Sequence, residues 1–168
     1  MKKSRFLYLM NYQLNDLNSM TKYQQITAIF NKWIGKQVDF DKVYWSQCVD
    51  WARQFAKEIW EPINTFGGSA YSGWSSGKPF TGTKWKRINR TPWLVPTAWD
   101  IIFFWPTQSN PYGHVAVTNG ASTTEKLNIV EQNAWNANWD WKWSNAIKKS
   151  SVGYDARGKC LWWFTLEK

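Results

Sequence analysis

Residues that can act as a base near neutral pH are scarce in this chain, which has one histidine, His114, among its 168 residues. Histidine is the side chain whose unperturbed pKa lies nearest neutral pH. Cysteine is also scarce: Cys48 and Cys160 allow at most one disulfide and form no Cys-x-x-Cys pair, so no set of zinc ligands has the usual spacing. Cys160 lies in an apolar run, where a buried thiol that behaves as a small hydrophobe is expected. A cysteine nucleophile with a histidine base would therefore be Cys48 with His114.

Long hydrophobic runs are absent as well. No apolar stretch approaches the roughly 20 residues that a membrane-spanning helix needs, so we expect no membrane insertion. The apolar stretch near the N-terminus covers only residues 6–10, which is shorter than the about 7–15 residues of a secretory signal. We expect no signal peptide and synthesis in the cytoplasm, so an extracellular substrate would be reached only after another component releases the protein.

The charge balance is strongly basic. The net charge is +9, which favours a polyanionic environment such as nucleic acid, an anionic membrane or an anionic cell wall. The lysines and arginines are scattered and form no long block, so charge does not choose among these partners. Nucleic acid is disfavoured because no recognised binding motif or basic stripe is present.

Tryptophan is unusually abundant, with 15 residues in the chain. Most are expected to pack in the interior. Four of them crowd the segment 135–143 among asparagines and cannot all point into one core. Because flat aromatic faces stack on sugars, bases or extended peptides, one or two could instead contact a ligand.

The order of predicted elements indicates an α+β fold. Apolar spacing predicts a helix over 14–35 that stops at Gly35, and a second helix over 47–60 that ends before Pro62. Residues 64–98 are rich in Gly, Ser, Thr and Pro and predict a long loop with a short helix around 70–74. Short strands follow at 100–105, 114–118, 127–132 and 159–166. With no internal repeat and no linker, we expect one domain in which N-terminal helices pack on a C-terminal antiparallel sheet.

These elements bring together candidate catalytic residues. Cys48 lies at a predicted helix start, where free N–H groups and the helix dipole stabilise a thiolate and can help to hold an oxyanion. His114 begins a strand after a turn and could face that helix start. On the strand near 127–133, Glu131 and Asn133 share one face, and either could orient the imidazole. The alternative is that Cys48 is a core residue, His114 a satisfied strand residue, Glu131 a surface residue and Asn133 a turn residue.

At this point the sequence resembles a known family. Four motifs occur in the order found in CHAP domains, and the resemblance covers about residues 25 to 166. They are Gln47-Cys48-x-Asp50, the run from Asp100 to Trp105, the run from Gly113 to Val117, and the run from Val130 to Asn133. These are cysteine, histidine-dependent amidohydrolases/peptidases with a papain-like fold, many of them phage endolysins or bacterial wall hydrolases. One departure is Trp99, where the family commonly has a glycine before the aspartate.

The resemblance implies roles for individual residues. It implies Cys48 as nucleophile, His114 as general base, Glu131 as imidazole orienter and Asn133 as a fourth polar member. It also implies an N-terminal extension over 1–24, partly helical, and a catalytic domain over 25–168.

A calcium site is predicted beside the nucleophile. Asp39, Asp41 and Asp50 stand at positions 1, 3 and 12 of an EF-hand-like spacing, although the position that an EF-hand gives to glycine is a tyrosine. Some CHAP endolysins have a similar Asp-x-Asp-x-x-Tyr-x-x-Gln-Cys-x-Asp stretch that binds calcium. That resemblance implies that the backbone carbonyls of Val43 and Trp45 complete the site. The alternative is a solvated acidic turn.

The expected function is hydrolysis of a peptidoglycan amide bond, by an N-acetylmuramoyl-L-alanine amidase or by a stem or cross-bridge endopeptidase. The substrate groove is expected between the 64–98 region and the tryptophan-rich 134–143 segment. Bacterial peptidoglycan is the expected partner, with anionic wall polymers as further candidates and a wall-binding domain or subunit outside this chain. Two alternatives stay open: a papain-like protease or deamidase acting on proteins, and a non-catalytic, basic, tryptophan-rich module that binds glycans or polyanions.

Overall fold

The computed structural model describes residues 20–133 and 146–167 of the chain, and their arrangement is α+β. The N-terminal half supplies the helices α2 (Lys22–Trp33), α3 (Cys48–Glu58) and α4 (Ala70–Ser76), followed by a short 3-10 turn, η1 (Lys78–Phe80). The six strands are β1 (Trp85–Asn89), β2 (Ile101–Phe104), β3 (His114–Thr118), β4 (Lys126–Glu131), β5 (Lys148–Gly153) and β6 (Cys160–Leu166). The predicted fold class is confirmed. The division of the chain at residue 24 stays a prediction.

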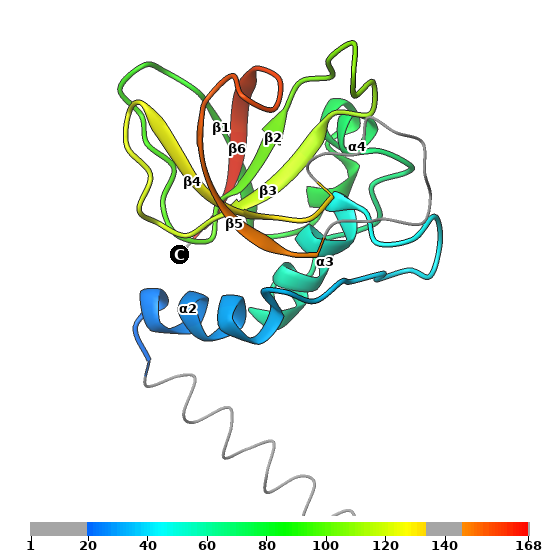
Figure 1. The fold of residues 1–168 in the computed structure, drawn as a ribbon, viewed down its shortest axis with the longest axis horizontal. Coiled ribbons are helices and arrows are strands. Elements are labelled where there is room, and N and C mark those ends of the chain that lie inside the picture. The colour runs from blue at the N-terminus through cyan, green and yellow to red at the C-terminus, as the bar shows by residue number, and fades with distance from the viewer. Residues whose placement is uncertain (1–19, 134–145, 168) are drawn as a thin grey trace, which may run out of the picture.

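The strands form one antiparallel sheet in the order β1-β6-β2-β3-β4-β5 (Figure 1). The central strands β2 and β3 are buried along their whole length. Helices α2 and α3 lie on one side of the sheet, and α3 packs directly against β3 (Figure 1). This packing carries the first residue of α3 toward the end of the sheet where β3 begins.

Apolar side chains fill both faces of the sheet, as the alternation of strand side chains requires. The larger cluster lies between the sheet and the helices and includes Phe30, Trp51 and Phe55 with the strand residues Val115 and Val130. A smaller cluster on the opposite face is formed by residues of β2, β3, β4 and β6 with one tyrosine from the turn after β5: Ile102, Phe104, Ala116, Leu127, Ile129, Tyr154, Cys160 and Trp163. Burial from both sides explains why the central strands contain almost only apolar residues.

Local signals explain the helix boundaries. Thr21 caps α2 in a capping box with Gln24, and Gly35, at φ 81°, follows the helix where a stop was predicted. The part of the predicted helix over 14–19 lies outside the described residues. Helix α3 ends at Glu58, shortly before Pro62, with Trp60 in the left-handed region at φ 60°.

The prediction of a long loop over 64–98 is wrong in part, because this region contains β1 as well as the predicted short helix α4. Strand β5 was also not predicted. Both strands lie at the edges of the sheet. In β1 only Trp85 is buried, and β5 has no buried residue. Edge strands that bury so little carry a weak apolar signal in the sequence.

Within the described part of the chain, we find no helix that is both long enough and apolar enough to cross a membrane.

Candidate active site

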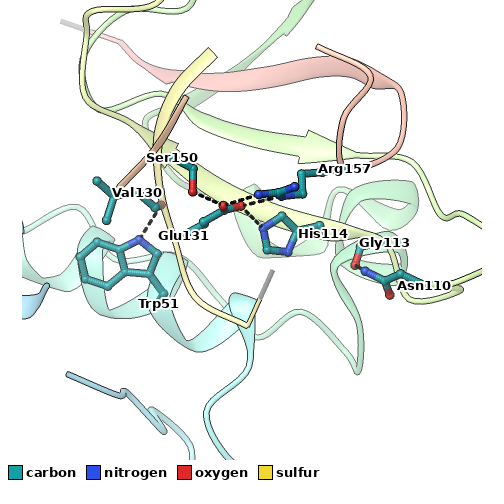
Figure 2. A network of polar contacts seen from close by, with 8 residues as sticks. All are labelled: Trp51, Asn110, Gly113, His114, Val130, Glu131, Ser150 and Arg157. Atoms are coloured by element: carbon teal, nitrogen blue, oxygen red, sulfur yellow. Dashed lines mark hydrogen bonds and ion pairs between the residues drawn. The ribbon is translucent and has the colours of Figure 1, made fainter. Parts of the chain in front are cut away.

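Cys48 is the first residue of α3 and is half-buried. The helix start is fixed by its own residues: the backbone N–H of Gln47 donates to Asp50 Oδ2 at 2.7 Å. Further along α3, the fully buried Trp51 donates from Nε1 to the carbonyl oxygen of Val130 at 3.0 Å, which ties the helix to β4 (Figure 2). The thiol therefore lies at a helix N-terminus that is held against the sheet.

His114, the first residue of β3, lines the same cleft as Cys48. The turn before it is held by a bond from Asn110 Nδ2 to the carbonyl oxygen of Gly113 at 2.8 Å (Figure 2). Gly113 has φ 68°, and a Cβ there would lie 2.9 Å from the carbonyl oxygen of Phe104. Only glycine fits this position without a shift of the backbone, so the turn delivers the imidazole to a fixed place.

The imidazole of His114 is almost completely buried and interacts with the Cys48 thiol and the Glu131 carboxylate. Its Nε2 lies 3.0 Å from Glu131 Oε2. Burial lowers the pKa of His114, but interactions with Cys48 and with Glu131 outweigh that effect and raise the pKa to about 9. The imidazolium form therefore persists at neutral pH, where a cysteine hydrolase needs a proton donor for the leaving amine.

Glu131 is fully buried and accepts hydrogen bonds from three side chains (Figure 2). Besides His114, they are Ser150 of β5, whose hydroxyl contacts Oε1, and Arg157. The Arg157 guanidinium contacts both carboxylate oxygens, with Nη2 at 3.0 Å from Oε1 and Nε at 3.3 Å from Oε2. Burial raises the pKa of Glu131, but the bonds from His114, Arg157 and Ser150 lower it to about 2. Sequence reasoning missed Ser150 and Arg157, because only the pairing of β5 with β4 brings their segment to Glu131.

Asn133 follows the end of β4 in a left-handed conformation, at φ 53°. Its Nδ2 donates to Gln47 Oε1 at 3.2 Å, while Gln47 Nε2 donates to the carbonyl oxygen of Tyr44 at 2.6 Å. Asn133 thus lies beside the residue that precedes the nucleophile, and Glu131 is the residue bonded to the imidazole.

Gln132, which the sequence reasoning also did not single out, bonds to three backbone groups of two residues. It is fully buried, its Oε1 accepts from Val38 N–H, and its Nε2 donates to the carbonyl oxygens of Val38 and Gln47, each at 2.8 Å. Both ends of the segment that carries the candidate metal ligands are therefore fixed to the end of β4.

Asp39, Asp41 and Asp50 come together as predicted, with one carboxylate oxygen from each lying within 4.8 Å of the others. Burial raises the pKa of Asp50 to about 6, and the charges of Asp41 and Asp39 contribute to that rise. Asp39 Oδ1 and Asp50 Oδ1 are buried without a hydrogen-bond partner in the described structure. One cation already lies close, because Arg53 Nη1 contacts Asp41 Oδ2 at 2.8 Å.

The chemistry of this aspartate set fits a hard divalent cation. Three carboxylates, two of which have an unpaired buried oxygen, are the kind of donor set that calcium prefers, and their mutual repulsion is relieved by a bound positive charge. Val43 and Trp45, whose carbonyls were predicted to complete the set, lie in the same loop, which also lines the cleft.

The cleft that contains Cys48 and His114 has a volume of about 980 Å³. Its walls come from the candidate metal loop, from residues 65–70, from residues 109–113 before β3, and from residues 155–158. Exposed aromatic side chains line it on two sides: Tyr44 and Trp45 from the metal loop, and Tyr112 from the turn before His114. The 65–70 wall agrees with the predicted groove, whereas the 134–143 segment lies outside the described residues.

Asp100, the aspartate of the second motif, stabilises the local fold. It is buried, and its Oδ2 accepts from the Thr97 N–H at 2.7 Å. Trp99 before it occupies the left-handed region at φ 81°, and the ammonium of Lys22 lies 5.0 Å from its ring centroid. The left-handed backbone explains why glycine suits this position.

The arrangement can perform acyl transfer. A thiol at a helix start, an imidazole against it and a buried carboxylate behind the imidazole form a nucleophile, a base and an orienting group. The first N–H groups of a helix lack intrahelical acceptors, so those at the start of α3 are candidates to hold a developing oxyanion.

Comparison with known proteins gives the same picture of the fold. Among solved structures, the chain is similar to the wild-type endolysin LysIME-EF1, with a TM-score of 0.64 and 20% identity over 88% of this chain and 65% of that one. It is also similar to Ly7917 in complex with the hydrolysing product of MDP, with a TM-score of 0.56 and 19% identity over 87% of this chain and 63% of that one. The chain thus spans a little less than two thirds of the length of either protein. No curated protein sequence gave a significant match.

The sequence model of the CHAP domain matches residues 38–133. This segment is more than half of the chain, and it runs from the candidate metal loop through the nucleophile helix to the end of β4. The chain therefore belongs to the CHAP domain family.

Proposed function

We propose that the chain is a peptidoglycan hydrolase that cleaves an amide bond with Cys48 as nucleophile. The observation that carries the proposal is the meeting of Cys48 and His114 at one cleft, with the buried Glu131 carboxylate bonded to the imidazole from a third element. Family membership supports amide hydrolysis, and the likeness to an endolysin supports the cell wall as substrate.

The reaction has two halves. The Cys48 thiolate attacks the carbonyl carbon, and the oxyanion is held by backbone N–H groups at the start of α3, with the Gln47 side chain as a further candidate donor. The C–N bond breaks as His114 protonates the leaving amine, which leaves a thioester on Cys48. His114 then removes a proton from water, the resulting hydroxide attacks the thioester, and the acid product leaves as the thiol is restored. Glu131 keeps the imidazole oriented and stabilises its positive charge throughout.

Substitution of the nucleophile tests the proposal. Cys48→Ala and His114→Ala should abolish clearing of purified cell walls, while circular dichroism shows that both variants remain folded. Cys160→Ala is the matched control: its thiol is buried in the small cluster away from the cleft, and burial raises its pKa to about 12, so clearing should persist. Clearing by Cys48→Ala at the wild-type rate would overturn the proposal.

The class of bond is decided by its products. Mass spectrometry of fragments from a defined peptidoglycan should reveal a freed lactyl group for an N-acetylmuramoyl-L-alanine amidase, or new amino ends on peptides for an endopeptidase. Digestion of casein in place of cell walls would instead favour a protease that acts on proteins.

We further propose that Asp39, Asp41 and Asp50, with the carbonyls of Val43 and Trp45, hold calcium. When bound, the ion supplies positive charge that draws the loop together, and it takes no direct part in bond cleavage. The support is the meeting of three carboxylates with two unpaired buried oxygens, close to the helix start that carries Cys48.

Metal binding is tested separately from activity. Calorimetry with calcium should give binding to the wild type, with a rise in melting temperature that EDTA reverses. Asp39→Asn should weaken binding about 10-fold or more, because it removes one of the charged ligands. Asp155→Asn, which removes an exposed carboxylate outside the cluster, should bind as the wild type does. No heat of binding in the wild type would contradict the proposed site.

A further inference from the structure

The carboxylate of Glu131 has a partner in every direction in which it can accept a hydrogen bond. Oε1 contacts the Ser150 hydroxyl and Arg157 Nη2, and Oε2 contacts His114 Nε2 and Arg157 Nε. Figure 2 shows the three side chains converging on this carboxylate from β5, the following loop and β3. A carboxylate has about four lone-pair sites, so the set is complete and leaves the group little freedom to rotate.

Arg157 is the only permanent cation of this set, and its contact has the geometry of a fork. Two guanidinium nitrogens face two carboxylate oxygens, an arrangement that fixes orientation as well as charge. The arginine side chain is 11% exposed and that of Glu131 is 0% exposed, so water screens the pair weakly.

The backbone explains how an arginine in a loop reaches a buried carboxylate. Gly158, the next residue, has φ 99°, and a Cβ there would lie 2.0 Å from the carbonyl oxygen of Trp105. The Trp105 N–H in turn donates to the carbonyl oxygen of Lys159 at 2.9 Å. The loop is therefore pressed against the end of β2, which holds Arg157 at the cleft.

We propose that Arg157 is a positioning residue of the active site: it holds the Glu131 carboxylate ionised and oriented so that Oε2 receives the N–H of His114. Ser150 assists by occupying Oε1. This inference rests on the proposed function for its catalytic meaning, but the coupling of Arg157 to His114 through Glu131 is measurable without any substrate.

The charge of Arg157 has a defined effect on the imidazole. A cation beside Glu131 offsets part of the attraction between the carboxylate and the imidazolium, so its loss should make the His114–Glu131 pair hold its proton more tightly. The other groups near the pair are the Cys48 thiol, which interacts with the imidazole, and Lys148, which stands opposite Glu131 in the β4–β5 register. The other charged residues of the cleft are Asp41, Asp50, Arg53 and Asp155.

The experiment uses the fact that His114 is the one histidine of the chain. In protein labelled with ¹³C at the imidazole, a single signal reports its titration. Arg157→Gln should raise the midpoint by about 0.5 pH units or more and reduce wall clearing about 10- to 100-fold. Arg157→Lys keeps the charge but loses the fork, so its midpoint should stay near that of the wild type while clearing still falls.

Lys149→Gln is the control, because it removes an exposed positive charge next to Ser150 on β5. Its midpoint and clearing rate should match those of the wild type. An Arg157→Gln midpoint and rate equal to wild-type values would overturn the inference. If that variant does not fold, Arg157→Lys with wild-type clearing would overturn it instead. A Cys48→Ala protein that still clears walls would overturn the proposed function and leave the titration result standing.

Discussion

At the scale of the residue, the buried His114 holds its proton because of its interactions with two other side chains. Burial by itself would favour the neutral ring, and the interactions with Cys48 and Glu131 reverse that preference. The charge state of one side chain therefore depends on partners from α3 and from β4. Replacing either partner should be visible in the pH dependence of the enzyme.

Activity should fall as the pH rises past about 9. The folded-state pKa of His114 lies above its usual value of 6.5, so the imidazolium is present at neutral pH and is lost as the pH rises through about 9. The stability that this charge contributes is fully present below pH 6.5 and is lost as the pH rises from 6.5 to about 9. The clearing rate of purified walls, measured from pH 6 to 10.5, checks this expectation.

Glu131→Gln should move the alkaline fall in clearing rate to lower pH, because it removes the negative charge that favours the imidazolium form of His114. This direction is opposite to the one expected for Arg157→Gln. Titration of the His114 signal measures both shifts. A midpoint at or above the wild-type value in Glu131→Gln would contradict the assigned partner.

Single residues differ in how readily the sequence predicts their place. Cys48 and His114 could be singled out because so few residues offer their chemistry. Strand alternation left Glu131 and Asn133 as alternatives for the orienting group, and the resemblance to CHAP domains favoured Glu131. Ser150 and Arg157 belong to common residue types on an edge strand and a loop, and only strand pairing brings them to Glu131. Gln132 was missed for a related reason, since its three backbone partners are distant in the sequence.

At the scale of the element, the site depends on how α3, β4 and the segment before Cys48 are joined. Trp51 ties α3 to β4, and Gln132 ties the end of β4 to Val38 and Gln47. These contacts come from Val130 of β4 and from Gln132, which directly follows the strand. The nucleophile and the carboxylate behind the histidine are thus held to a common strand.

Gln132→Leu should destabilise the protein by about 3 kcal/mol or more, because it leaves the buried N–H and carbonyl of Val38 without partners and removes one of the two hydrogen bonds to the Gln47 carbonyl. Urea unfolding measures the change. Gln54→Leu is the matched control: Gln54 bonds to Glu58 within α3 at a half-buried position, and its loss should cost about 0.5 kcal/mol or less. Equal costs at the two positions would mean that the three contacts contribute nothing beyond an ordinary surface pair.

The apolar pattern of each element explains which elements could be predicted. Helix α3 has its apolar residues on one face, and β2 and β3 are short apolar runs between turns, so their patterns were clear. Strands β1 and β5 bury little, and their polar residues resemble those of a loop. They form because β6 and β4 offer free edges for hydrogen bonding, which is a tertiary effect that local sequence does not encode.

At the scale of the whole molecule, the net charge of +9 is the property most relevant to a wall substrate. A basic protein is attracted to anionic wall polymers before any specific contact forms, and salt screens that attraction. Anionic polymers of the wall therefore remain proposed partners beside peptidoglycan itself.

Adsorption to walls should weaken as salt increases. We expect the Cys48→Ala protein, which leaves the substrate intact, to bind purified walls at low salt and to be released progressively toward about 0.5 M sodium chloride. Walls stripped of anionic polymers should bind less protein at every salt concentration. Sedimentation of the walls with bound protein measures both effects, and adsorption independent of salt would contradict an electrostatic origin.

The bonds of Gln132 have a thermodynamic consequence for the candidate metal loop. Because its amide joins Val38 to Gln47, the two ends of the segment that carries Asp39 and Asp41 are brought together when the chain folds. The entropy of closing that loop is then lost during folding and not when an ion arrives. An ion that enters a closed loop has less disorder to remove and binds more tightly for the same ligands. Gln132, which supplies no ligand to the proposed site, would in this way help to set its affinity.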